Sequence, residues 1–309
     1  MRQKSFKSKF FYWLYRYRYL HLMALPCLLY FIIFKYLPMY GIIIAFQDYK
    51  GFSRSFLANE WVGLKNFARF FQSIYFWRLL RNTLILSCFR LTIGFVSPII
   101  LALQINELKS ILFKRTVQTI TYMPYFLSWV VTAGILMTIL SPDNGPVNVL
   151  LGKLFGIEPI YFVSDSRFFR GILVASDIWK EVGWGSIIYL AAITGVNPEL
   201  YEAVTVDGGS RWQKIWYITL PSIKEIVAIM FILAVGRILD QNFDQIFNLY
   251  NPVVYEVADV FDTYVYRSGI KAGEFSYATA IGLFKSLVAL LMVSVSNVVS
   301  KKLGSEGLW

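Results

Sequence analysis

Apolar residues in this sequence gather in long blocks separated by short polar connections. Each block approaches the ~20 residues that an α-helix needs to cross a bilayer. The pattern therefore predicts an all-α membrane protein whose chain crosses the bilayer about six times. The spans are expected at residues 20–42, 83–105, 118–140, 171–195, 223–243 and 278–299.

The composition supports a membrane protein. Of the 309 residues, 57% are hydrophobic and 18% aromatic, and soluble chains rarely hold apolar residues in blocks this long. The first block is too long for a cleavable signal peptide, and no small-x-small site follows it, so we expect a retained span. Cys27 and Cys88 fall inside predicted spans, where buried and inert thiols are expected.

The net charge of +11 is distributed along the chain as membrane topology requires, which argues against a nucleic-acid surface. Residues 1–19 carry only basic charges directly before the first span, which predicts a cytoplasmic N-terminal tail. Residues 20–300 then form one membrane domain, and the tail 301–309 is also cytoplasmic. The loop after the fifth span is acidic, as suits the outside. Residues 47–81 are an exception, because this predicted external loop has six basic and two acidic residues.

Two external segments have distinct patterns. Residues 62–80 place aromatic and aliphatic side chains at helical spacing with basic residues between them. This pattern predicts one amphipathic helix on the outer membrane interface. Residues 141–170 contain Gly and Pro but no run of span length, and predict a loop.

Several charged side chains lie within or near the ends of the predicted spans, where a charge costs at least ~2.5–3.5 kcal/mol on insertion scales. They are Lys35, Arg90, Asp177, Lys180, Glu181, Arg237 and Lys285. Asp177, Lys180 and Glu181 share one helix face by their spacing and can pair with one another. Two interpretations stay open for this trio: an internal ion pair that fixes helix packing, or the lining of a solute path. Lys35 and Lys285 can also snorkel to the interface.

Residues 197–221 form a polar, glycine-broken connection between the fourth and fifth spans. Asn197 is placed to cap a helix that starts at Pro198, and the helix must stop at Gly208-Gly209, where the chain can turn sharply. Residues 210–213 have capping-box spacing and predict a second short helix.

The end of this connection is also predicted from local signals. Leu220-Pro221 is expected to end the second helix, because proline disfavours helical geometry in the preceding residue. Ser222 and Glu225 have capping-box spacing and are expected to open the fifth span. The whole connection therefore predicts a compact polar knob of two short helices in the cytoplasm.

This connection resembles the EAA–G–I–LP loop of permease subunits of binding-protein-dependent ABC importers. The matching residues are Glu202, Ala203, Val204, Gly208, Ile218, Leu220 and Pro221. Val204 departs from the family, which usually has alanine there. Residues 36–50, 82–84, 124–129, 243–269 and the Gly-Leu-Trp end are similar to the oligosaccharide branch of these importers.

The resemblance implies a type I importer permease in the bacterial cytoplasmic membrane and a set of partners. These are a second permease subunit, expected as a different chain in a heterodimer, two ATPase subunits, an extracytoplasmic solute-binding protein and an oligosaccharide. The knob would be the coupling helix that enters a cleft of the ATPase, with Glu202 and Gly208 at its centre and Asp207 and Arg211 as polar flanks. The binding protein would dock on loops 43–81, 141–170 and 244–277.

Energy has to come from the partners, because the chain has no G-x-x-x-x-G-K-[ST] phosphate loop. ATP and Mg are expected in the ATPase subunits and no cofactor in this chain. An ATPase-independent transporter or channel is the alternative, against which the knob argues. An intramembrane enzyme is disfavoured: His21 is the sole histidine, no G-x-S-x-G elbow occurs, and nothing requires Asp177 and Asp240 to meet as a dyad.

Candidate solute-path residues lie in the last three spans and at their edges. Trp179, Trp184 and Tyr189 offer faces on which a pyranose could stack, and Asn242, Asp244 and Gln245 offer hydrogen bonds to hydroxyls. Belt aromatics and solvated span ends are the alternative interpretation. Lys35, Arg90 and Arg237 suggest a further hypothesis, that cations near the path neutralise an acidic, uronate-containing oligosaccharide.

Overall fold

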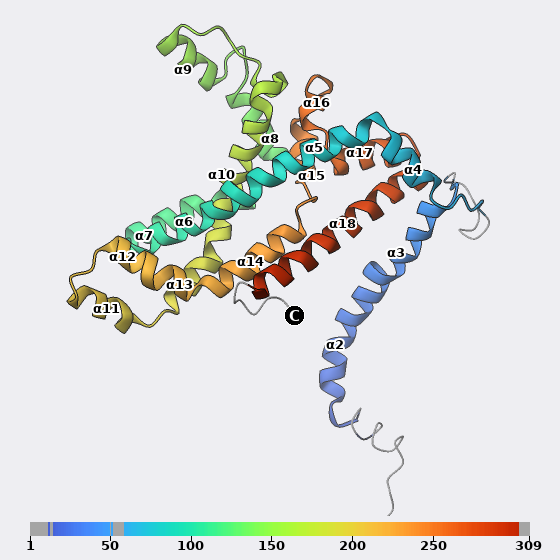
Figure 1. The fold of residues 1–309 in the computed structure, drawn as a ribbon. Coiled ribbons are helices and arrows are strands. Elements are labelled where there is room, and N and C mark those ends of the chain that lie inside the picture. The colour runs from blue at the N-terminus through green and yellow to red at the C-terminus, as the bar shows by residue number, and fades with distance from the viewer. Residues whose placement is uncertain (1–11, 13–14, 50, 52–58, 303–309) are drawn as a thin grey trace, which may run out of the picture.

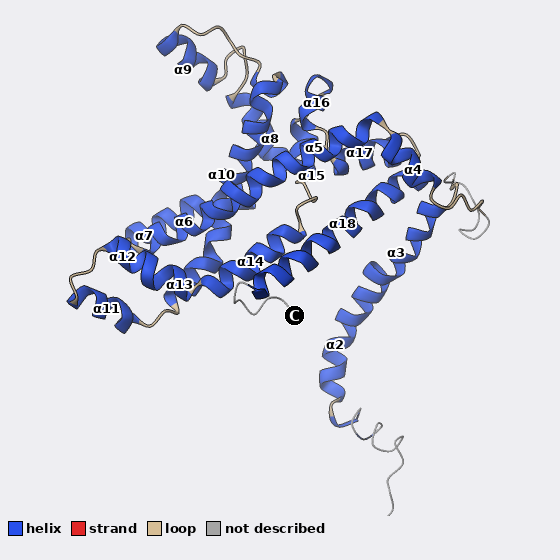
Figure 2. Ribbon diagram, in the orientation of Figure 1, coloured by secondary structure: helices blue, strands red, loops and turns tan. Residues whose placement is uncertain are grey.

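The computed structural model describes residues 12, 15–49, 51 and 59–302. Within these residues the regular secondary structure is helical, apart from one isolated bridge between Gln47 and Trp61, and loops connect the helices (Figure 2). Most of the predicted tails 1–19 and 301–309, with the Gly-Leu-Trp end, lies outside the described residues.

The first half of the chain forms the following elements, in which η denotes a 3-10 or π-helical stretch. They are α2 (Arg18–Phe31), η1 (Ile32–Tyr36), α3 (Leu37–Met39), η2 (Tyr40–Phe46), α4 (Lys65–Gln72), α5 (Ile74–Phe89), η4 (Arg90–Gly94), α6 (Phe95–Asn106), α7 (Ile111–Tyr122), η5 (Met123–Phe126), α8 (Trp129–Ile139) and α9 (Pro146–Phe155).

The second half begins with a long central helix. Its elements are η6 (Phe162–Ser164), α10 (Ser166–Thr194), α11 (Pro198–Val206), α12 (Arg211–Lys214), η7 (Ile215–Thr219), α13 (Leu220–Ser222), α14 (Lys224–Gly236), α15 (Phe243–Leu249), η8 (Pro252–Val254), α16 (Tyr255–Ala258), α17 (Phe261–Val265), η9 (Tyr266–Lys271) and α18 (Phe275–Lys302).

Among the described residues, three helical stretches are long and apolar enough to cross a membrane: Arg18–Phe46, Ile74–Asn106 and Phe275–Lys302. Two bent pairs bring the number to five if each pair is one span. α10 covers the predicted span 171–195, but the three charges in its middle keep it outside this set.

The prediction of one uninterrupted span at 118–140 is wrong. The helical stretch Ile111–Phe126 meets α8 at an angle of 103°. Leu127 and Ser128 adopt extended backbone, and the Ser128 hydroxyl accepts a hydrogen bond from the Val131 N–H, which starts a new helix. The break follows a proline and a serine cap, so the local signal was present in the sequence.

The prediction of one amphipathic helix over 62–80 is also wrong. α4 ends at Gln72 and α5 begins at Ile74, because Ser73 has extended backbone and donates its hydroxyl to the Phe70 carbonyl at 2.8 Å. Phe70 is fully buried among the rings of Phe261 and Phe284. Its burial fixes α4 against the C-terminal helices.

α10 is the central helix, and it packs closely against α6 and α7. A side chain at Gly183 would lie 2.0 Å from the Thr121 carbonyl oxygen, and one at Gly185 would lie 3.1 Å from the Pro98 ring. Glycine is therefore required at Gly183 for the close approach of α10 and α7. This packing positions one face of α10 toward α5, α6 and α14.

Two elements stand apart from the helical bundle (Figure 1). The stretch from α2 through α3 has no buried residue, and α9 projects at the end opposite to α11. Cys27 and Cys88 are both exposed. The prediction of buried thiols is therefore wrong for this chain taken alone, because both lie on helix faces that its other helices leave open.

Candidate functional site

A cavity of about 810 Å³ lies between α5–α6, α10 and α14. Its charged lining consists of Arg90, Asp177, Glu181, Arg237 and Asp240, and aromatic rings of α6 and α10 add apolar surface. A space of this size, with several convergent polar groups, is suited to a sugar-sized ligand.

The predicted path residues divide into two groups by position. Those that line the cavity are Arg90, Trp184, Tyr189, Arg237 and Asn242. Those that do not line it are Lys35, Trp179, Asp244 and Gln245. Lys35 is exposed on η1, in the stretch that stands apart from the bundle, and Trp179 and Asp244 are also exposed.

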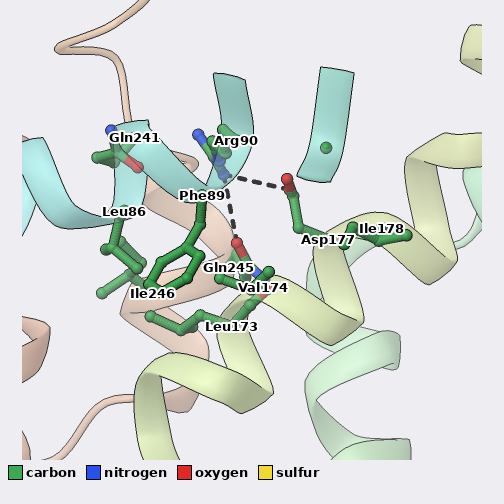
Figure 3. A pocket seen from close by; sticks show the side chains of 11 residues that line it. Leu86, Phe89, Arg90, Leu173, Val174, Asp177, Ile178, Gln241, Gln245 and Ile246 are labelled. Atoms are coloured by element: carbon green, nitrogen blue, oxygen red, sulfur yellow. Dashed lines mark hydrogen bonds and ion pairs between the residues drawn. The ribbon is translucent and has the colours of Figure 1, made fainter. Parts of the chain in front are cut away.

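Arg90 lies at one edge of the cavity and joins three segments, and Figure 3 shows it among the residues that line a small adjoining pocket. Its guanidinium donates to Asp177 Oδ1 at 3.2 Å, to Gln245 Oε1 at 3.4 Å and to the Asp240 carbonyl at 3.2 Å. Gln245 is buried and donates to the Leu173 carbonyl at 2.7 Å. Gln245 therefore links the Arg90 side chain to the backbone of α10.

The predicted pairing within the trio Asp177, Lys180 and Glu181 is wrong. Asp177 pairs with Arg90, whereas buried Lys180 donates to the Tyr125 carbonyl at 2.7 Å and lies over the Tyr125 ring. The reason is that the 100° step per residue lets Lys180 point toward η5 while Asp177 and Glu181 face the cavity.

The remaining membrane cations also differ from one another. Lys285 is only 14% exposed and contacts both Asp240 and Asp262 at 2.5 Å, so it is an internal crosslink rather than a snorkelling side chain. Arg237 lines the cavity, is exposed, and forms no ion pair with any residue that the structure describes. Its charge is therefore available within the cavity.

Aromatic residues line one wall of the cavity. Trp184 stacks on Tyr125, with ring centroids 4.5 Å apart and planes 5° from parallel. Trp184 is still 44% exposed, whereas Tyr189 is 3% exposed and contacts the Phe95 ring edge-on. The exposed part of Trp184 is thus a supported apolar platform of the kind that sugar rings use.

Ion pairs between two segments that the sequence predicts as external were not predicted from the sequence. The pairs are Arg69–Glu274 at 2.7 Å, Arg78–Asp259 at 3.4 Å and Arg81–Glu256 at 3.9 Å. They join the basic segment 47–81 to the acidic segment that follows the fifth predicted span. Opposite charge in the two segments was the signal, and it accounts for the basic exception in the predicted topology.

A second network, at the same end, is buried. Asp259 is fully buried and pairs with Arg267 at 2.5 Å, and Thr263 donates to its other oxygen at 2.8 Å. Asn82 donates to the Asp259 carbonyl at 3.0 Å and accepts from Arg170 at 2.8 Å. These bonds fix α16 and α17 on α5 and α10, at the end of the molecule opposite to the connection 197–221.

The connection 197–221, named here the coupling loop after the role that the resemblance implies, begins as predicted. Asn197 accepts from the Glu199 N–H at 3.0 Å and caps α11. Gly208 has φ +75°, which supplies the turn, and the capping box of Ser210 and Gln213 is present.

The end of the coupling loop differs from the prediction. The helix continues through η7 to Ser222, and the break of 64° falls at Ile223. Pro221 lies near the end of this continuous helix, directly after the π-helical η7, whose altered hydrogen-bond pattern accommodates a residue without an N–H. Ser222 does not cap α14, so the second predicted capping box is wrong.

The coupling loop presents an exposed surface. Glu202, Ala203, Asp207, Gly208 and Arg211 are exposed, and Val204 is half-buried. Two apolar side chains, Val206 at 87% and Trp212 at 71% exposure, lie among these polar groups. Leu220 is half-buried and Pro221 exposed. An apolar patch with a polar rim is typical of a protein docking site.

The two halves of the coupling loop are also tied together. Lys214 donates to the Thr205 hydroxyl at 2.6 Å, and the hydroxyls of Tyr201 and Thr219 lie 3.1 Å apart. Arg211 lies 3.9 Å from Glu107 at the end of α6. A force applied to α11 would therefore reach both α6 and the helix before α14.

Residues 94–304 match a family described as the binding-protein-dependent transport system inner membrane component. The chain belongs to this family. The polygalacturonan/rhamnogalacturonan transport system permease protein YteP of Bacillus subtilis (strain 168) is 47% identical over 292 residues, or 94% of this chain and 90% of YteP. Protein LplB of the same organism is 45% identical over 94% of this chain and 91% of LplB.

Solved structures give the same result. A bacterial alginate ABC transporter in complex with an alginate pentasaccharide-bound periplasmic protein contains a chain that is 42% identical. It superimposes with a TM-score of 0.88 over 96% of this chain and 98% of that chain. The resemblance to importer permeases and the expected membrane location are therefore confirmed, together with the helical type I permease fold.

Proposed function

We propose that this chain is the permease subunit of an ATP-driven importer that moves an acidic oligosaccharide across the bacterial cytoplasmic membrane by alternating access. The observation that carries the proposal is the 810 Å³ cavity with Arg90 and Arg237 in its wall. Its partners would be a second permease subunit, two ATPase subunits and an extracytoplasmic solute-binding protein. The solved relative with a sugar-loaded periplasmic protein supports this assembly.

The chain would act as a transport subunit and not as an enzyme. Its sequence lacks a phosphate-binding loop, so ATP and Mg would bind to the ATPase subunits. Docking of α11 in an ATPase cleft would couple nucleotide-driven closure to the helices around the cavity. Such coupling requires that the docked states differ in free energy. An ATPase-independent channel would have no use for this exposed, capped loop.

The cavity lining has no excess of cations, but one of its two arginines forms no ion pair with a described residue and would be available to a carboxylate. Arg90 is balanced by Asp177, and Asp240 is balanced by Lys285. Arg237 and Glu181 remain, without an ion pair to a described residue. Arg237 would therefore pair with a uronate carboxylate while the sugar ring lies against Trp184. The names of relatives that refer to polygalacturonan and alginate support this cargo class.

Uptake by the complete transporter in lipid vesicles tests the proposal. The two substrates are an oligogalacturonide and its neutral methyl ester, each at a concentration that saturates the binding protein. Arg237→Gln should lower uptake of the acid roughly tenfold and leave the ester unchanged, because hydrogen bonds to charged groups contribute about 1.5–3 kcal/mol.

Arg167→Gln is the matched control, because Arg167 is an exposed arginine outside the cavity. It should leave the ratio of acid to ester uptake unchanged. Equal loss of both substrates in Arg237→Gln would contradict a role for Arg237 in reading the carboxylate.

A further inference from the structure

Arg90 lies where a large and a small cavity meet. The large cavity shares five lining residues with a cavity of about 10 Å³, which holds at most one water. The shared residues are Arg90, Gly94, Asp177, Ile178 and Gln241. Arg90 and its partners therefore form a partition between the two.

The far side of the partition is apolar and closed. Leu86, Leu173 and Ile246 line the small cavity and belong to a buried core cluster that extends to α16. α16 lies at the end of the molecule opposite to α11 (Figure 1). The partition thus closes the large cavity on the side away from the coupling loop.

Arg90 fastens this closure with one charged and two neutral acceptors. Asp177 provides the charged acceptor, from α10, and Gln245 provides a neutral one (Figure 3). The Asp240 carbonyl provides the second neutral acceptor. The side chains of Arg90 and Asp177 are 27% and 17% exposed, so their ion pair can be reached from the large cavity. A carboxylate that enters this cavity has the same chemistry as Asp177.

We propose that Arg90 and Asp177 form a latch that an acidic substrate opens by exchange of carboxylates. This inference rests on the proposed function. The uronate takes the place of Asp177 on the Arg90 guanidinium, and α10 loses its charged link to η4. A neutral sugar has no group that competes for Arg90 at comparable strength.

Asp177 would then lack a second cation. Lys180, the basic residue nearest to it on α10, is already bonded to the Tyr125 carbonyl and lies over the Tyr125 and Trp129 rings. Glu181 adds another negative charge to the same wall. Repulsion from the bound uronate would therefore drive Asp177 away from Arg90 and separate α10 from η4.

The backbone at Arg90 is suited to such a change. Arg90 begins the π-helical stretch η4 between the α-helices α5 and α6. π-helical turns carry one extra residue, and they are frequent at functional sites. A shift of the π-helical turn would let the α5–α6 helix bend where the latch releases it.

ATP hydrolysis and uptake by the complete transporter in lipid test the latch. Asp177→Asn should raise hydrolysis without substrate about fivefold, the lower end of typical coupling energies. It should also raise uptake of the neutral methyl ester of an oligogalacturonide by a similar factor. Asp177→Glu, which keeps the charge, should behave like the wild type.

The control is Thr138→Val, which removes an exposed hydroxyl of α8 outside the cavity and outside the predicted docking loops, and should change neither rate. An unchanged basal rate and unchanged ester uptake in Asp177→Asn would overturn the latch. A parallel fall in the uptake of both sugars, with a lower melting temperature, would also overturn it, because the pair would then be structural. A wild-type complex that imports neither sugar would instead contradict the proposed function.

Discussion

The coupling loop and the cavity wall are built in opposite ways. The caps that start the two helices of the coupling loop join residues two or three apart, as in Asn197–Glu199 and Ser210–Gln213, and its predicted docking face is exposed. The Arg90 contacts join residues 87 and 155 apart and are largely buried. Changes in the coupling loop should therefore impair transport without unfolding the chain, whereas changes behind the cavity wall should reduce stability.

The largest effect is expected for Gly209→Ala in the coupling loop. A side chain at Gly209 would lie 2.3 Å from Val204 Cγ1 and 2.9 Å from the Val204 carbonyl oxygen, so the turn would have to open. Hydrolysis stimulated by sugar-loaded binding protein should fall at least about tenfold, as misplaced functional groups commonly cost far more than their contacts. The assay is ATP hydrolysis by the assembled complex in lipid, with the amount of inserted chain measured in parallel.

Gly134→Ala is the matched control for this variant. Gly134 lies in α8, outside the coupling loop and the predicted docking loops, and an added side chain would meet no atom within 4 Å. Its stimulated hydrolysis should equal that of the wild type. If Gly209→Ala behaved the same way, the geometry of the turn would not matter for coupling.

A smaller effect, on stability, is expected behind the cavity wall for Gln245→Leu. This change leaves one Arg90 N–H without its acceptor and removes the buried donor to the Leu173 carbonyl and the Ser176 hydroxyl. Each buried polar group left unpaired costs about 1–3 kcal/mol, so the melting temperature of the chain should fall by several degrees. Asp244→Ala, at the exposed neighbouring position, should leave the melting temperature unchanged. A similar fall in melting temperature in both variants would contradict the conclusion that Gln245 is a buried structural residue and Asp244 is not.

The same contrast explains what could be predicted from the sequence. Caps and glycines act over a few residues, so α11, its turn and the capping box of α12 were readable from the sequence. The pairing of Asp177 with Arg90 instead of Lys180 depends on how α10 packs on α5, which no local pattern specifies. The charges themselves could be found by their place in apolar blocks, but their partners could not.

Errors in the local predictions also have physical causes. Pro221 was expected to end a helix, but the π-helical η7 precedes it and moves the break to Ile223. The cap at Ser128 was present in the sequence, but it lies within an apolar run of span length, so the helix break there was not predicted. Hydropathy detects the length of an apolar segment and is insensitive to a single residue that turns it.

The smallest effect is expected for Val204→Ala, at the one motif position where this chain departs from the family pattern. Val204 is half-buried and lies beside Gly209, so loss of two methyl groups should leave stimulated ATP hydrolysis unchanged within about twofold. When Val204→Ala is combined with Gly209→Ala, it removes Val204 Cγ1, the nearer of the two atoms that clash with the added side chain. The Val204 carbonyl oxygen remains at 2.9 Å. The double variant should therefore recover part of the lost hydrolysis, and a double-mutant cycle in the same assay measures the recovery. Strictly additive effects would mean that Val204 does not limit the turn, and that only the backbone contact requires glycine at position 209.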